Sequence, residues 1–169
     1  MIKIKYIEVK GFKLYENTNI SFENKVGLAN LIGKNSDILG FDSNSSGKST
    51  FSNIFLQIVF GKNLEGQAQE DIIHKYTKTP FSGKIIIDIV NPATKETKEL
   101  IISRDNGKTG KDSLVFYVDN VYQGKSNPLE IKTRKTEIQE DIDNVLGIGY
   151  TTFKKLLYLS PNEKTLFST

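Results

Sequence analysis

Apolar and polar residues alternate at the start of the chain. Residues 2–9, with the sequence IKIKYIEV, show the pattern of a strand with one buried face. The run KGFKLY continues this strand through a glycine, and residues 18–24 form a second short alternating run. We therefore predict that a strand–loop–strand pair opens the chain. Two short apolar runs, at 26–32 and 37–41, predict further strands, the second of them buried.

The period of the pattern changes after Lys48. Leu56 and Phe60 widen an apolar stripe that has helical spacing, and Gly61 stands where a helix-ending glycine is expected. The sequence thus predicts a helix that begins near Lys48, ends near Phe60 and is buried over more than half of its circumference. The stripe itself recurs at i, i+3, i+4, i+7 and i+8 and consists of Phe51, Ile54, Phe55, Ile58 and Val59.

The second half of the chain returns to strand patterns. Three runs, at 82–90, 98–105 and 113–120, are joined by turn-rich segments, which is the spacing of an antiparallel sheet. An amphipathic helix follows over 135–147, on Ile138, Ile142 and Val145 and ending at Gly147, and 151–159 reads as a second short helix or a helix-to-strand passage.

Composition supports one soluble α/β domain that spans residues 1–169. Apolar residues make up 37% and charged residues 25%, and the absence of cysteine excludes disulfides and thiolate metal sites. The N-terminus lacks the apolar core of a signal peptide, and no apolar run approaches the ~18 residues of a membrane span. We therefore expect a cytoplasmic protein with no membrane partner. The net charge of +3 is only a weak indication of nucleic-acid binding.

Residues 38–50, ILGFDSNSSGKST, carry the candidate chemistry. Gly47, Lys48 and Ser49 match the second half of the phosphate-loop pattern G-x-x-x-x-G-K-[ST], while Asp42 replaces its first glycine. In such a loop, successive backbone N–H groups converge on phosphate oxygens at the start of a helix, the lysine reaches the β- and γ-phosphates, and the next hydroxyl binds Mg²⁺.

The flanking pattern supports this interpretation, since a predicted buried strand precedes the loop and a strong helix follows it. We predict an ATP site with Ser49 as a Mg²⁺ ligand. The alternative is a solvated turn in which Ser46 caps the helix and Lys48 is merely exposed. Aspartate tolerates unusual backbone angles, but the charge of Asp42 would weaken phosphate binding unless it faces away. The predicted nucleotide contacts in the loop are Asn44, Ser45, Ser46, Gly47, Lys48, Ser49 and Thr50.

Three segments, taken in order, resemble a known family. IEVKGFKLYENTNISF, FDSNSSGKSTFSNIFLQIVFGK and GIGYTTFKKLLYL are similar to the N-terminal half of an SMC-like ABC ATPase, over nearly the whole chain. The closest likeness is to the SbcC-type ATPase subunit of double-strand-break repair nucleases and its phage recombination-endonuclease counterparts. The resemblance implies a P-loop NTPase fold, the N-terminal lobe of an ABC-type ATPase head with a largely antiparallel sheet.

The resemblance also implies cofactors and partners. Such a lobe binds ATP and Mg²⁺, and a coiled coil followed by a C-terminal half with the signature and Walker B motifs completes the ATPase. Neither is found in this sequence, so we expect ATP hydrolysis only when a C-terminal half or a second head is supplied. A nuclease subunit and double-stranded DNA are the implied partners, in the host cytoplasm if the gene is carried by a phage.

Individual positions follow from the same resemblance. Phe12 and Lys13 match an aromatic–basic pair whose cation reaches the nucleotide phosphates, and Asn44 matches the asparagine of the family's loop, in which Asp42 and Ser45 replace two glycines. Arg104 matches a basic residue at a strand end, for which a structural role in the sheet is an equal alternative.

A glutamine that helps to hold Mg²⁺ is also expected, eight residues after the phenylalanine of GIGYTTFKKLLYL. That position is Pro161, which cannot bind the ion. Ser160 or Asn162 could substitute, and Asn162 is therefore the second predicted metal ligand.

No catalytic residue is predicted within the chain. Asp88 follows three isoleucines as a Walker B aspartate would, but it alternates with Ile87 and Ile89 and no glutamate follows it, so we predict a surface strand residue. His74 is predicted to lie on the surface without a partner. Two other functions stay open, namely a non-catalytic nucleotide-binding or interaction module and a different P-loop enzyme such as a nucleotide kinase.

Overall fold

The computed structural model describes residues 1–23, 48–62, 72–106, 112–119, 121–122 and 135–157. These residues form strands and helices in the order β1 (Ile2–Phe12), β2 (Tyr15–Ser21), α1 (Lys48–Phe60), β3 (Ser82–Val90), β4 (Thr97–Asn106), β5 (Asp112–Val118), β6 (Val121–Tyr122), α2 (Lys135–Leu146) and α3 (Tyr150–Leu157).

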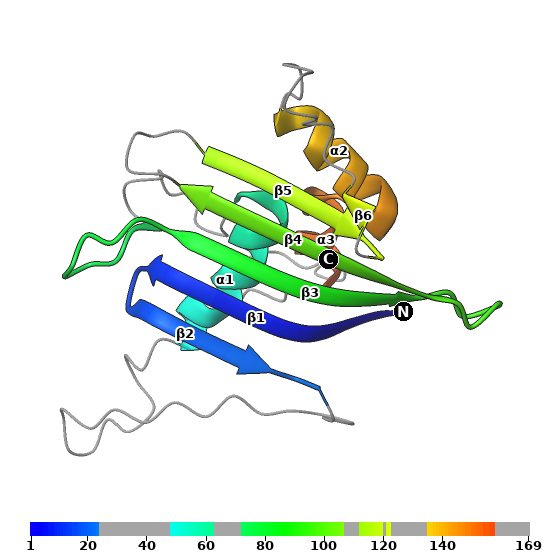
Figure 1. The fold of residues 1–169 in the computed structure, drawn as a ribbon, viewed down its shortest axis with the longest axis horizontal. Coiled ribbons are helices and arrows are strands. Elements are labelled where there is room, and N and C mark those ends of the chain that lie inside the picture. The colour runs from blue at the N-terminus through cyan, green and yellow to red at the C-terminus, as the bar shows by residue number, and fades with distance from the viewer. Residues whose placement is uncertain (24–47, 63–71, 107–111, 120, 123–134, 158–169) are drawn as a thin grey trace, which may run out of the picture.

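One antiparallel sheet organises the described residues. Its six strands lie in the order β2-β1-β3-β4-β5-β6, and every neighbouring pair is antiparallel. Helix α1 crosses one face of the sheet, and α2 lies beside β5 on the same side (Figure 1). The predicted α/β architecture with a largely antiparallel sheet is confirmed. The predicted strands at 26–32 and 37–41 lie outside the described residues.

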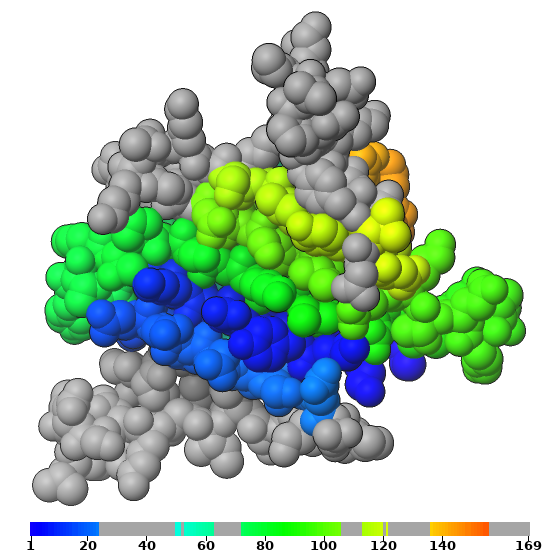
Figure 2. All heavy atoms as spheres, viewed as in Figure 1, coloured from blue at the N-terminus to red at the C-terminus, as the bar shows by residue number. Residues whose placement is uncertain are grey.

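Alternation along the strands separates the two faces of the sheet. Ile85 and Ile87 of β3 have no exposed surface and pack in the core under α1, together with Leu100 and Ile102 of β4. A Cβ atom built on Gly83 would lie 2.5 Å from Ile58 Cγ1, so glycine at this position lets α1 approach the sheet closely. The opposite face, on β1, β3 and β4, is turned toward the viewer in Figure 2.

Helix α1 is buried further round than its apolar stripe requires. It ends at Gly61 as predicted, with a φ of +64° and a hydrogen bond from the Gly61 N–H to the Gln57 carbonyl. The polar side chains of Asn53 and Gln57 follow each other at helical spacing on the face that would ordinarily meet solvent, yet these residues are only 2% and 6% exposed. The nearly continuous burial marks α1 as the central helix of the described structure.

The first hairpin differs from the sequence-based prediction in its second strand. β2 covers Tyr15–Ser21 rather than 18–24, because Phe12 pairs with Tyr15 and only Lys13 and Leu14 form the turn. The turn geometry therefore sets the start of β2, and the apolar pattern alone does not show it. The other predicted strands and helices among the described residues lie within a few residues of their predicted bounds, and 150–157 is a helix. The two-residue strand β6 was not predicted.

None of the helices in the described part of the chain has the length and hydropathy needed to cross a membrane.

Candidate nucleotide-binding site

The candidate site lies at the start of α1. The helix begins at Lys48, so Lys48, Ser49 and Thr50 occupy its first turn. The first N–H groups of a helix have no partner within it, and its dipole makes this end favourable for anions. No acidic residue lies in the first turn of α1 to compete for these groups. The end of the helix that carries the Gly-Lys-Ser sequence is therefore chemically suited to phosphate.

Lys13 is fixed by the backbone around it. It lies in the β1–β2 turn with a φ of +50°, its N–H donates to the Ile72 carbonyl at 2.9 Å, and its own carbonyl accepts from the Lys75 N–H at 2.8 Å. The segment before β3 is thus hydrogen-bonded to both the N–H and the carbonyl group of Lys13. Figure 1 shows this turn at the end of β1, at the edge of the sheet formed by β1 and β2.

The neighbour of Lys13 anchors the turn in the core. Phe12 has no exposed surface, and its ring meets that of Phe81 edge to face at 5.6 Å. Gly11 has a φ of +68°, and a Cβ atom there would overlap the backbone oxygen of Pro80. Only glycine fits between the two segments at this point. Phe12, the aromatic member of the predicted aromatic–basic pair, is therefore a core residue. Its burial holds the backbone of the adjacent Lys13 in place.

His74 does not lie on the surface, contrary to the prediction. It is 5% exposed, its Nδ1 atom accepts a hydrogen bond from the Thr77 N–H at 3.1 Å, and the Thr77 hydroxyl lies 2.7 Å from the same nitrogen. The imidazole closes the short turn that follows it, and this turn packs beside the turn of Lys13. A lone histidine in a sequence carries no signal of such a local role, because its partner is a backbone group.

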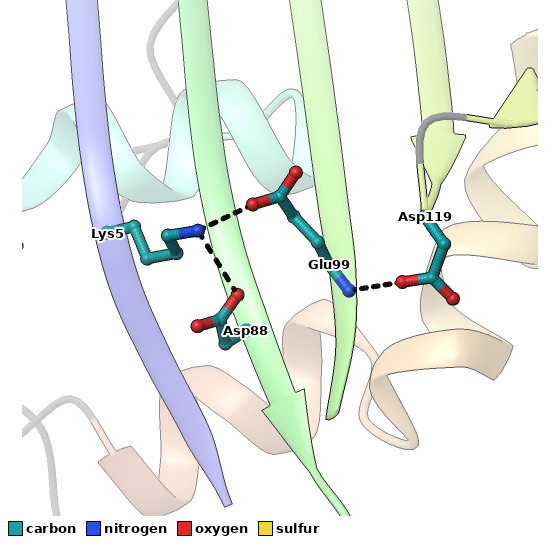
Figure 3. Close-up of polar contacts among 4 residues, drawn as sticks. All are labelled: Lys5, Asp88, Glu99 and Asp119. Atoms are coloured by element: carbon teal, nitrogen blue, oxygen red, sulfur yellow. Dashed lines mark hydrogen bonds and ion pairs between the residues drawn. The ribbon is translucent and has the colours of Figure 1, made fainter. Parts of the chain in front are cut away.

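Asp88 faces away from α1, as its alternation predicts. It lies 3.8 Å from Lys5 Nζ, and the same ammonium group donates to Glu99 at 2.6 Å (Figure 3). The Glu99 N–H in turn donates to the carboxylate of Asp119. The hydrogen bond to Glu99 raises the pKa of Lys5 above its ordinary value, and the neighbouring carboxylates raise it further. Asp88 is thus engaged on the far face of the sheet and is not placed to act as a Walker B aspartate.

Arg104 has a structural role that the sequence left as one of two alternatives. It is only 5% exposed, and its guanidinium group donates to the carbonyl of Ile58 at 3.0 Å and to the side chain of Gln139 at 2.7 Å. Gln139 was not singled out from the sequence. Its only signal there is a position between the apolar residues Ile138 and Ile142 of α2 and one helical turn before Asp143.

The remaining predicted contacts are untested. Positions 42–47 and 160–162 lie outside the described residues, which includes the predicted loop contacts before the helix and the predicted metal ligand Asn162. Within the part of the chain that the structure describes, no three histidine, aspartate or glutamate residues come together as a metal site. The Mg²⁺ ligands Ser49 and Asn162 therefore stay predictions.

Comparison with known proteins finds likenesses among the solved structures. A chain in the solved "Structure of the recombination mediator protein RecF-ATP in RecFOR pathway" matches this chain with a TM-score of 0.47 and 17% sequence identity. The match covers 73% of this chain but only 29% of that chain, so this chain spans a minor part of the length of the solved one. No family model matches the chain, and no curated protein matches its sequence.

Proposed function

We propose that the chain binds ATP with Mg²⁺ at the start of α1. The observation that carries the proposal is the coincidence of the Gly-Lys-Ser sequence with the first residue of a buried helix, at Lys48. A phosphate loop needs this arrangement, because its backbone N–H groups must be held in place by a helix that does not move when the anion binds. A solvated Ser/Asn turn would have no need of a helix buried on nearly all sides.

In this proposal each group has a defined task. The backbone from Asn44 to Thr50 surrounds the phosphates, Lys48 neutralises charge on the β- and γ-phosphates, and Ser49 binds the metal ion. Lys13 adds a second cation from the β1–β2 turn. Its support is the rigid setting of that turn, whose backbone is hydrogen-bonded to Ile72 and Lys75.

The finer part of the proposal concerns the assembly. On the family resemblance, the chain acts as the N-terminal half of an SMC-like ATPase that works with a nuclease on double-stranded DNA, in break repair or phage recombination. The engagement of Asp88 with Lys5 on the far face of the sheet supports this division, because it leaves the water-activating carboxylate to be supplied by a C-terminal half or second head.

The test is a calorimetric titration of the chain with ATP and Mg²⁺, next to Lys48→Ala. Loss of the lysine removes charge-assisted hydrogen bonds worth about 1.5–3 kcal/mol, or about 10- to 150-fold in affinity. Lys155→Ala is the matched control, because Lys155 is an exposed lysine on another helix, α3. If folded Lys48→Ala binds ATP as tightly as the Lys155→Ala control, the proposal is wrong.

A further inference from the structure

The far end of α1 is held by side chains from other elements. The Ile58 carbonyl accepts from Arg104 Nε at 3.0 Å, and the Val59 carbonyl accepts from Gln139 Nε2 at 3.1 Å and, at 3.5 Å, from Arg104. These are carbonyl groups of the last turn, which a helix cannot satisfy by itself. Helix α1 has no basic residue of its own in that turn. The cation that complements its negative end comes instead from β4.

The buried Arg104 and the half-buried Gln139 form one hydrogen-bonded unit, which we call the α1 clamp. Gln139 Oε1 accepts from Arg104 at 2.7 Å while Gln139 Nε2 donates to α1, so the amide uses both of its ends. Gly61 packs against the guanidinium group, because a Cβ atom there would lie 2.7 Å from one of its terminal nitrogens. Strand β4, helix α1 and helix α2 therefore meet at two side chains whose positions depend on each other.

The clamp continues into the corner between α2 and α3. Gln139 Nε2 also donates to the carboxylate of Asp143 at 2.9 Å, and the Asp143 carbonyl accepts from the Ile148 N–H just after α2 ends. From there α3 returns to α1, where the ring of Phe153 stacks on that of Phe55 with centroids 5.0 Å apart. Helix α1 thus touches the α2–α3 pair through hydrogen bonds at its end and through aromatic rings along its side.

We propose that Arg104 and Gln139 are positioning residues of the nucleotide site and that they couple this site to the α2–α3 corner. The inference rests on the proposed function. Helix α1 is a rod of 13 residues, about 20 Å long at roughly 1.5 Å per residue. A tilt or slide at its clamped end moves the first turn by a similar amount. Hydrogen bonds from the backbone to phosphate tolerate only a few tenths of an ångström of such displacement.

The direction of the coupling follows from linkage. If the clamp holds α1 in the arrangement that binds phosphate, then bound phosphate must favour the closed clamp by the same factor. Nucleotide at the start of α1 should consequently slow the opening of the α2–α3 corner, even though no residue of that corner needs to touch the nucleotide. A clamp with a purely structural role would raise the stability of the fold without any response to ATP.

The experiment uses the full chain with Gln139→Leu, which removes both the donor to Val59 and the acceptor for Arg104. Glu140→Leu is the matched control, because Glu140 is the next residue of α2 and is exposed. ATP affinity is measured by calorimetry well below the melting temperature of each variant. Amide hydrogen exchange at the α2–α3 corner, around Gly147 and Ile148, is followed with and without ATP.

We expect Gln139→Leu to bind ATP at least about 5-fold more weakly than the control, the low end of couplings between separate sites. We also expect ATP to slow exchange at the corner in the wild-type chain and in Glu140→Leu but not in Gln139→Leu. Equal affinity and an equal exchange response in folded Gln139→Leu would overturn the inference while leaving the proposed function intact. Failure of the wild-type chain to bind ATP would instead overturn the proposed function, and the inference with it.

A second variant covers the case in which Gln139→Leu does not fold. Gln139→Glu keeps an acceptor for Arg104 but loses the donor to Val59 and to Asp143, so the bond from Gln139 to α1 is removed while the guanidinium stays paired. The same two measurements apply. Weaker ATP binding together with a lost exchange response supports the inference, and wild-type values of both contradict it.

Discussion

Replacing Gly61 with alanine should reveal how strongly the end of α1 depends on Arg104. A residue with a Cβ atom pays about 1–2 kcal/mol for a left-handed backbone such as the φ of +64° at this position. The new methyl group would also lie 2.7 Å from a terminal nitrogen and 2.9 Å from the central carbon of the guanidinium group. Because those contacts are too close, Arg104 must move away from the carbonyl of Ile58.

The displacement of Arg104 lowers the free energy of unfolding further, in addition to the backbone strain. A hydrogen bond from a charged donor contributes about 1.5–3 kcal/mol, so Gly61→Ala should destabilise the chain by about 2.5–5 kcal/mol in all. Gly147 offers a matched control at the end of α2. Its φ is +68°, but nothing lies within 4 Å of a Cβ atom built there. Gly147→Ala should therefore show the backbone strain alone, about 1–2 kcal/mol.

Urea denaturation of the two variants and the wild-type chain measures both values. The informative quantity is the difference between the two glycine substitutions, since the strain of the left-handed backbone is common to them. A clearly larger loss at Gly61 supports the account of Arg104 as a buried partner of the helix end. If Gly61→Ala loses no more stability than Gly147→Ala, the guanidinium group moves without penalty and the reasoning about the clamp is refuted.

Three further predictions concern the loop, the reaction and the turn beside Lys13. Asp42→Gly should leave ATP affinity unchanged or lower and should reduce the melting temperature, because we expect Asp42 to hold the turn through its side chain. Tighter ATP binding in calorimetry would show instead that the charge of Asp42 opposes the phosphates. The isolated chain should bind ATP but hydrolyse it negligibly, and phosphate release near ~1 s⁻¹ that Lys48→Ala abolishes would reveal a complete active site. His74→Leu should reduce the free energy of unfolding by about 1 kcal/mol or more, because it leaves the Thr77 N–H without its acceptor. A thermal melt that matches the wild-type chain would contradict this.

Local patterns predicted those parts of the fold that depend on one element at a time. The stripe from Phe51 to Val59 requires a helix, and Gly61 marks its end because only a residue without a Cβ atom adopts the left-handed backbone easily. The alternation in β3 likewise predicts which side of the sheet Asp88 faces. In both cases the decisive information lies within about a dozen residues of the chain.

Burial of polar residues could not be predicted in the same way. Asn53, Gln57 and His74 are ordinary surface residue types, and each is buried here; His74 has a backbone group as a partner. The clamp is a similar case. Arg104 and Gln139 lie 35 positions apart, and nothing in either local pattern shows that they meet at the end of a third element.

For the candidate site, the sequence predicted the local motif but not the contacts between distant segments. The position of Lys48 at the start of α1 agrees with the prediction, because the apolar residues that follow Lys48 have helical spacing. The setting of Lys13 needed the three-dimensional structure, since it depends on Ile72 and Lys75 in a segment about sixty residues later along the chain. The sequence of a turn alone does not show which distant residues hydrogen-bond to it.

The place of β1 between β2 and β3 has a consequence for folding. β3, β4 and β5 follow one another in the sequence and can form a meander through short connections. β1, in contrast, pairs with β3 only after the chain has closed a long loop. The N-terminal amine of Met1 and the carbonyl of Val90, to which it donates, are 89 positions apart. Such distant pairing is slow, and β1 and β2 alone form a hairpin that is marginally stable in water. We therefore expect β1, although it comes before the other five strands of this sheet in the sequence, to be the last of them to dock. The turn that carries Lys13 would then be complete only when the whole domain has folded.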